Sequence, residues 1–228
     1  EDKAQALLQE AARQVLGDVE ADVHWQAEWR RWFGNRETSG LLPAWLALER
    51  ERQARGWRWL GVEVAFQGLA RPGWPFTLKG RLDRLDFHPQ QGELIIWDYK
   101  TGNVPSAAQV FDRQEEFQLP GYLCAVREGE AGIDLTDIAG MSAGVICLKS
   151  SEKHLRHQDF AAHKDRWADL LESWEEEVRS LGELLLAGNL RPAPRPAPRR
   201  RDDGACLYCP CFLVCNYKPE TADAEDEP

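Results

Sequence analysis

The sequence has no hydrophobic run that approaches the roughly 20 residues needed to span a bilayer. Its first residues also lack the basic and apolar regions of a signal peptide. Methionine occurs once, at Met141, and the chain opens at Glu1, so we expect the sequence to be part of a longer polypeptide. These absences argue against a membrane as a partner.

Positive net charge is also absent. The formal net charge is -10 at pH 7, whereas nucleic-acid-binding proteins usually carry a basic surface. This argues only weakly against a nucleic-acid substrate, because a metal-dependent nuclease needs clustered carboxylates and its divalent ions reverse the local electric field. Part of the acidic charge also lies near the end of the chain, at Glu220, Asp223, Glu225, Asp226 and Glu227.

Apolar residues are plentiful, and their spacing predicts the secondary structure. The chain has 228 residues, 43% of them hydrophobic, which is enough for one sizeable core. Helical spacing predicts helices over residues 4–15, 24–33, 41–55, 111–127 and 160–187. Alternation and apolar runs predict strands over residues 57–67, 76–87, 93–100 and 140–148, with a hairpin turn at 89–92. The order of a helix, three strands, a helix and a strand predicts an α/β fold with a mixed sheet and additional N- and C-terminal helices.

Three tryptophans on the second predicted helix, Trp25, Trp29 and Trp32, are spaced i, i+4, i+7 and so share one face. Aromatic rings on a surface can stack on bases, but helical spacing favours a stripe that packs into the core. We therefore expect this face of the helix to pack against the core.

Two short segments carry a candidate metal site. An apolar strand ends in Asp98-Tyr99-Lys100, and because side chains at i and i+2 share one face of a strand, Asp98 and Lys100 project together. If the hairpin pairs as predicted, Asp83 lies level with Asp98 on the neighbouring strand. Two close carboxylates repel unless a divalent cation lies between them. A lysine beside that cation can orient or deprotonate a water that attacks phosphorus.

This residue set suits phosphodiester hydrolysis. The sequence shows no Ser or Cys nucleophile paired with a clear base, and no glycine-rich loop that cradles a phosphate. An Asp-x-Lys sequence by itself is more often a solvated salt bridge. The whole assembly is more specific, because the predicted helix that follows carries Gln118 and Tyr122 at i, i+4 on one face.

Together these segments resemble the RecB-like branch of the PD-(D/E)XK nucleases, especially the C-terminal nuclease domain of AddB-type recombination proteins, over roughly residues 45–215. The resemblance implies a restriction-endonuclease-like core and a deoxyribonuclease that depends on Mg2+ or Mn2+. It further implies an exonuclease that acts on DNA beside a helicase partner in double-strand-break repair and recombination. The alternatives are a stand-alone endonuclease of this fold and a catalytically degenerate DNA-binding or structural module.

The resemblance also assigns roles to individual residues. It implies that Asp83, Asp98 and the backbone carbonyl of Tyr99 bind the metal, and that Lys100 is the catalytic lysine. Gln118 and Tyr122 match a Gln-x-x-x-Tyr motif that lies beside the DNA and the active site. Glu63, on the preceding predicted strand, is either a further metal ligand or an exposed strand residue. A His on an upstream helix is common in the branch, but His24 lacks the expected surroundings.

Four of the six cysteines crowd together at Cys206, Cys209, Cys211 and Cys215. Short spacings of this kind hold soft metals or iron-sulfur clusters, and a reducing cytoplasm suits them better than a secreted disulfide scaffold does. The resemblance implies that Cys206, Cys209 and Cys215 bind a [4Fe-4S] cluster with a fourth, upstream Cys. No Cys precedes Cys124, so we expect an incomplete cluster unless Cys211 completes it; zinc and a disulfide are the alternatives. Cys124 and Cys147 are interpreted as core residues.

The chain is therefore predicted to have five regions. An N-terminal helical segment, 1–40, precedes a nuclease core with a long C-terminal helix, 41–190. A Pro/Arg linker, 191–204, leads to the cysteine cluster, 205–218, and a disordered acidic tail, 219–228. The densest basic patch lies in and near the linker, where it either solubilises the chain or contacts phosphates: Arg191, Arg195, Arg199, Arg200 and Arg201.

Overall fold

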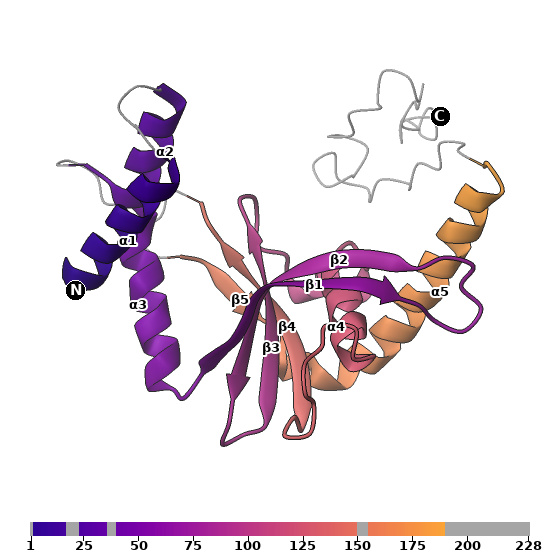
Figure 1. Cartoon of the computed structure of the whole chain (residues 1–228). Coiled ribbons are helices and arrows are strands. Elements are labelled where there is room, and N and C mark those ends of the chain that lie inside the picture. The colour runs from indigo at the N-terminus through magenta and orange to yellow at the C-terminus, as the bar shows by residue number, and fades with distance from the viewer. Residues whose placement is uncertain (1, 17–22, 36–39, 150–154, 190–228) are drawn as a thin grey trace, which may run out of the picture. The chain divides into compact units, whose positions relative to one another are not determined.

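The computed structural model describes residues 2–16, 23–35, 40–149 and 155–189. The chain forms two units, Glu1–Ser180 and Leu181–Pro228, and the fold of the first unit positions the candidate site. The elements, labelled in Figure 1 where there is room, are α1 (Asp2–Leu16), α2 (Val23–Phe33), α3 (Leu41–Ala54), β1 (Arg58–Leu69), β2 (Leu78–His88), β3 (Glu93–Lys100), the π-helix η2 (Ala108–Asp112), α4 (Gln118–Arg127), β4 (Gly140–Cys147), β5 (His157–Asp159), the 3₁₀-helix η3 (Ala161–Arg166) and α5 (Trp167–Leu186). None of the described helices is long and apolar enough to cross a membrane.

The strands form one mixed sheet in the order β1-β2-β3-β4-β5. β1, β2 and β3 pair antiparallel in sequence, β3 and β4 pair parallel, and β4 and β5 pair antiparallel. The turn between β2 and β3 has the predicted position, and Gly92 takes the positive φ of 65° that the turn requires there. The mixed α/β fold predicted from the sequence is confirmed. The short strand β5 was not predicted, because its three residues give too brief a pattern.

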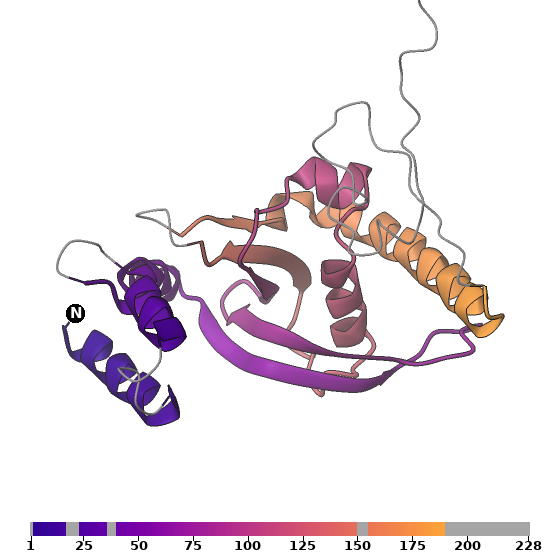
Figure 2. The same cartoon turned by 90° about the horizontal axis from the view of Figure 1, so that it is seen from above.

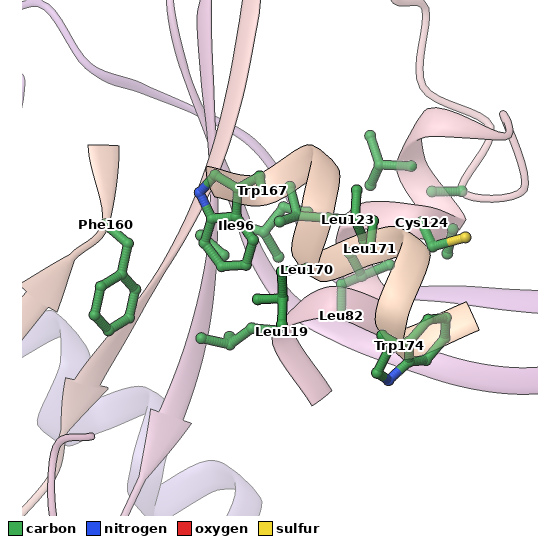
Figure 3. Close-up of a cluster of buried hydrophobic side chains, with 14 of the residues drawn as sticks. Leu82, Ile96, Leu119, Leu123, Cys124, Phe160, Trp167, Leu170, Leu171 and Trp174 are labelled. Carbon is green, nitrogen blue, oxygen red and sulfur yellow. The ribbon is translucent and has the colours of Figure 1, made fainter. Parts of the chain in front are cut away.

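The two faces of the sheet pack against different helices, because side chains alternate along each strand. On β3, Leu94 and Ile96 join the larger core cluster with residues of α4 and α5, and Figure 3 shows Ile96 beside Leu119 of α4 and Trp167 of α5. Ile95 and Trp97 join a second cluster on the other face, with residues of α3. Figure 2 shows α4 and α3 on opposite sides of the strands.

The predicted helix 111–127 is wrong in its first part. The structure has η2 at Ala108–Asp112, a non-helical stretch in which Gln114 has a φ of 50°, and then α4 from Gln118. Proline inside a helix lacks a backbone donor and clashes with the carbonyl four residues earlier. The helix therefore begins at Gln118, which leaves Pro120 in its first turn.

The tryptophan stripe of α2 is not the core stripe that its spacing predicts. No residue of α2 is buried, Trp25 is 42% exposed, and Trp32 packs only partly against the α3 face of the sheet. The prediction was wrong for Trp25, because helical spacing aligns side chains on one face but does not supply a surface to cover them. Cys124 and Cys147 are buried as predicted. The predicted linker 191–204, the cysteine cluster and the acidic tail lie outside the described residues.

Candidate functional site

The candidate site forms where β2 and β3 separate. The pairing of these strands ends at Arg84 and Trp97, so the register continued by one residue brings Asp83 opposite Asp98. Beyond this point a side chain replaces the backbone partner on β2: Asp83 Oδ2 accepts a hydrogen bond of 2.8 Å from the backbone N–H of Tyr99. Asp83 is thus fixed beside the last residues of β3.

A chain of polar contacts runs from the end of β3 to α4. Lys100 Nζ lies 2.9 Å from Asp98 Oδ2 and donates a hydrogen bond to Gln118 Oε1. Gln118 Nε2 in turn donates to the Tyr122 hydroxyl at 3.2 Å. The i, i+2 spacing on the strand and the i, i+4 spacing on the helix therefore bring these four side chains into one row.

Glu116 joins this row, although sequence reasoning did not single it out. Its Oε2 lies 3.6 Å from Lys100 Nζ, and its side chain is only 13% exposed. It lies outside the helix, in the non-helical stretch before α4. The only sequence signal is a carboxylate two residues before Gln118, which has meaning only once the end of the predicted helix is known.

The charges at the site perturb one another. Burial raises the pKa of Asp98, and the ion pair with Lys100 only partly opposes this, while the nearby charges of Asp83 and Glu116 raise the pKa further. Burial lowers the pKa of Lys100, but the hydrogen bond to Asp98 and the charge of Glu116 outweigh it, so the net pKa is raised. Burial, followed by the charges of Asp98 and Asp83, raises the pKa of Tyr122.

The donor set fits a hard divalent cation. The carboxylates of Asp83 and Glu116 both lie within electrostatic reach of Asp98, and Asp98 and Glu116 lie beside the Lys100 ammonium. Excess negative charge at a half-buried site is costly unless a cation offsets it. No group of three or more His, Cys, Asp or Glu suited to a metal occurs among the described residues. Mg2+ needs no such group, since it is often held by one or two carboxylates together with water and phosphate oxygens.

Other predicted positions are not brought into this row. Glu63 falls opposite Asp83 in the register between Val62 and Val64, but it is exposed and its Oε2 lies 2.8 Å from Arg81 Nε. It also has a φ of 51°, an uncommon conformation for a non-glycine residue. His24 is exposed on α2. The predicted cluster ligands Cys206, Cys209 and Cys215, with Cys211, lie outside the described residues.

Comparison with known proteins adds one finding. A family model described as the PD-(D/E)XK nuclease superfamily matches residues 1–216, which is most of the 228-residue chain. No curated protein matches the chain.

Proposed function

The chain belongs to the PD-(D/E)XK nuclease superfamily, and from this membership we propose that it is a divalent-metal-dependent deoxyribonuclease whose site is built on Asp83, Asp98 and Lys100. One observation carries the proposal. The Asp98–Lys100 pair lies between Asp83, which is fixed on the Tyr99 amide, and the Gln118–Tyr122 pair of α4. This is the set of groups that metal-assisted phosphodiester hydrolysis needs, gathered at one end of two strands.

We propose that Asp83, Asp98 and the carbonyl of Tyr99 hold the metal. In an extended strand the N–H and C=O of one residue point to the same neighbouring strand. The Tyr99 amide faces Asp83, so the Tyr99 carbonyl faces the same side, beyond the last paired residues of β2 and β3. Glu63 is a weaker candidate, because its carboxylate is already paired with Arg81.

Each remaining group has a role set by its position. A divalent cation at this site supplies Lewis-acid stabilisation of the negative charge that develops on the phosphate. The Lys100 ammonium, at the open end of the pair, orients the attacking water and offsets charge on the same phosphate. Gln118 holds the Lys100 ammonium and is itself held by Tyr122, so α4 fixes the lysine and lines the path of the DNA strand.

The finer assignment follows the sequence resemblance. We propose an exonuclease of the AddB type that acts in the cytoplasm on a DNA strand delivered by a helicase partner, in double-strand-break repair and recombination. We also propose that Cys206, Cys209 and Cys215 supply three thiolates to a [4Fe-4S] cluster, which needs a fourth ligand. Iron and sulfide analysis of protein purified without oxygen tests this point. About four irons per chain would show that Cys211 or another group completes the cluster.

A cleavage assay tests the proposed activity. Linear single- and double-stranded DNA should be cut with Mg2+ or Mn2+ and left intact with chelator, and circular DNA should resist an exonuclease. Asp98→Ala and Lys100→Ala should each lower turnover by roughly 100- to 1000-fold, the range seen when a group that stabilises the transition state is removed.

A matched control is Lys164→Ala, which removes a lysine that is also ion-paired, to Glu93, on a different part of the sheet. It should cut DNA at the wild-type rate. Wild-type turnover in the Lys100 or Asp98 variant under Mg2+ would show that the site is misassigned. DNA binding without any cleavage by the wild-type chain would favour the degenerate DNA-binding module instead.

A further inference from the structure

The side chain of Tyr99 lies on the face of the sheet opposite to Asp98 and Lys100. It packs with residues of α3 against the second core cluster, which includes Trp97. Its hydroxyl accepts a hydrogen bond of 3.1 Å from Arg84 Nη1 and a longer one, 3.5 Å, from Trp45 Nε1. Tyr99 is thus held through its backbone on the site face and through its hydroxyl on the α3 face.

Arg84, which holds that hydroxyl, is itself fixed in place. Arg84 is 1% exposed, and its guanidinium forms a bidentate pair with Asp86, at 2.7 and 2.8 Å. It also donates two hydrogen bonds to Glu49 of α3. Arg52 of α3 donates to Asp86 at 3.0 Å, and Trp59 of β1 donates to Glu49 at 2.8 Å. A planar fork that makes this many contacts cannot reorient without breaking several of them.

This network does not need Tyr99 to neutralise its charge. Two arginines, Arg52 and Arg84, face two carboxylates, Glu49 and Asp86. The Tyr99 hydroxyl adds no charge and forms one contact at the border of the network. The role of the hydroxyl is therefore to position Tyr99, because a buried arginine whose donors are all paired does not move easily.

Alternation along the strands places this contact directly behind the site. Arg84 follows Asp83 on β2, and Tyr99 follows Asp98 on β3, so Asp83 and Asp98 project to one face while Arg84 and Tyr99 project to the other. The same two strands that separate on the site side are therefore tied together on the α3 side. The end of β3 stays paired with β4 as far as Lys100. On the β2 side it lies beyond the last paired residue, so there only the Asp83–Tyr99 amide bond and the Arg84–Tyr99 contact link the two strands.

We propose that the Tyr99 hydroxyl, held by Arg84, is a positioning group for the metal site: it fixes the Tyr99 peptide, and with it the carbonyl ligand and the neighbouring Asp98. This inference rests on the proposed function, since it concerns the same metal. Groups that orient a ligand from outside the coordination sphere affect metal affinity although they never touch the metal. The α3 helix thereby takes part in metal binding from the far side of the sheet.

The test compares Mn2+ binding, followed by the electron paramagnetic resonance of free Mn2+, in wild-type protein and Tyr99→Phe. The variant keeps the ring and loses only the hydroxyl. Its Mn2+ dissociation constant should rise about tenfold, at the lower end of the range for outer partners of ligands. Cleavage should fall at low Mn2+ and return to within about twofold of wild type when Mn2+ is raised, because the fault lies in holding the metal.

Trp59→Phe is the matched control. It removes a hydrogen bond to Glu49 in the same network and keeps an aromatic ring over the Arg84 guanidinium, while the Tyr99 hydroxyl itself is unchanged. It should bind Mn2+ like wild type, and circular dichroism should show both variants folded. Equal weakening in both variants would overturn the inference, since the effect would then belong to the whole network.

Two further outcomes separate this inference from the proposed function. If Tyr99→Phe binds Mn2+ as tightly as wild type while Asp98→Asn does not, the metal site stands and the positioning role is wrong. If wild type and Asp98→Asn bind Mn2+ equally, or neither binds, the metal site itself is wrong and the positioning role fails with it.

Discussion

Both faces of the sheet carry a cluster of carboxylates and basic side chains, but the two clusters differ in their balance of charge. On the α3 face, Glu49, Asp86, Arg52 and Arg84 are all buried, and their charges balance. On the α4 face, three carboxylates accompany one lysine whose side chain is 24% exposed, so negative charge is left over. Both clusters flank the same pair of residues on β3, Asp98 and Tyr99.

The difference shows how charge balance separates a cluster that is neutral by itself from one that can accept a cation. A buried network is tolerated only when each charge has a partner and its hydrogen-bonding groups are satisfied. A cluster that opens to solvent can retain an excess of one sign, which a cation or substrate then offsets. On the α3 face each charged side chain lies beside an opposite charge, whereas the α4 face lacks positive charge.

Removing an arginine from the balanced face should have the largest effect. Arg84→Met leaves Glu49 and Asp86 buried with less compensation, and breaking such a pair costs about 3–5 kcal/mol. Urea denaturation should show this loss of the free energy of unfolding. Arg81 lies on the same strand as Arg84, but it is exposed and paired with Glu63 of β1. Arg81→Met should therefore change the free energy of unfolding by less than about 1 kcal/mol. Similar losses in both variants would contradict the contrast between the two faces.

Metal addition should affect only the unbalanced face. At 100 times its dissociation constant, Mg2+ or Mn2+ should stabilise wild-type protein by about 2.7 kcal/mol. Asp98→Asn should abolish this gain, since it removes a proposed ligand. Without metal the same variant should be at least as stable as wild type, because it removes a buried charge that faces Asp83 and Glu116. Thermal melts with metal and with chelator measure both effects, and a loss of stability without metal would argue against excess negative charge at the site.

The smallest predicted effect is on turnover, and it should differ between two glutamates near the site, Glu116 and Glu63. Glu116→Gln weakens the support of the Lys100 ammonium and should lower turnover about fivefold, which corresponds to about 1 kcal/mol for one partly buried ion pair. Glu63→Gln should change turnover by less than about twofold, because Glu63 is exposed and paired with Arg81. Steady-state cleavage rates test the pair. A larger loss in Glu63→Gln would instead support its assignment as a metal ligand.

Much of the fold and part of the site could be predicted from the sequence, because they follow from local periodicity. Alternation gave the strands, the turn before Gly92 gave the hairpin, and i, i+2 spacing placed Asp98 and Lys100 together. The break before α4 was missed because Pro120 was counted inside a helix. Glu116 was missed for the same reason, since its approach to Lys100 depends on the non-helical stretch.

The sequence by itself therefore determined which residues share a face: alternation and helical spacing are properties of the chain and need no partner surface. The tertiary structure decided which faces meet, and with that which charges are compensated. It placed the Arg84–Tyr99 contact behind Asp83 and Asp98, and it left Trp25 42% exposed. The physical reason is that burial and electrostatic compensation depend on segments far apart in the sequence, such as α3 against β2 and β3, whose approach no local pattern records.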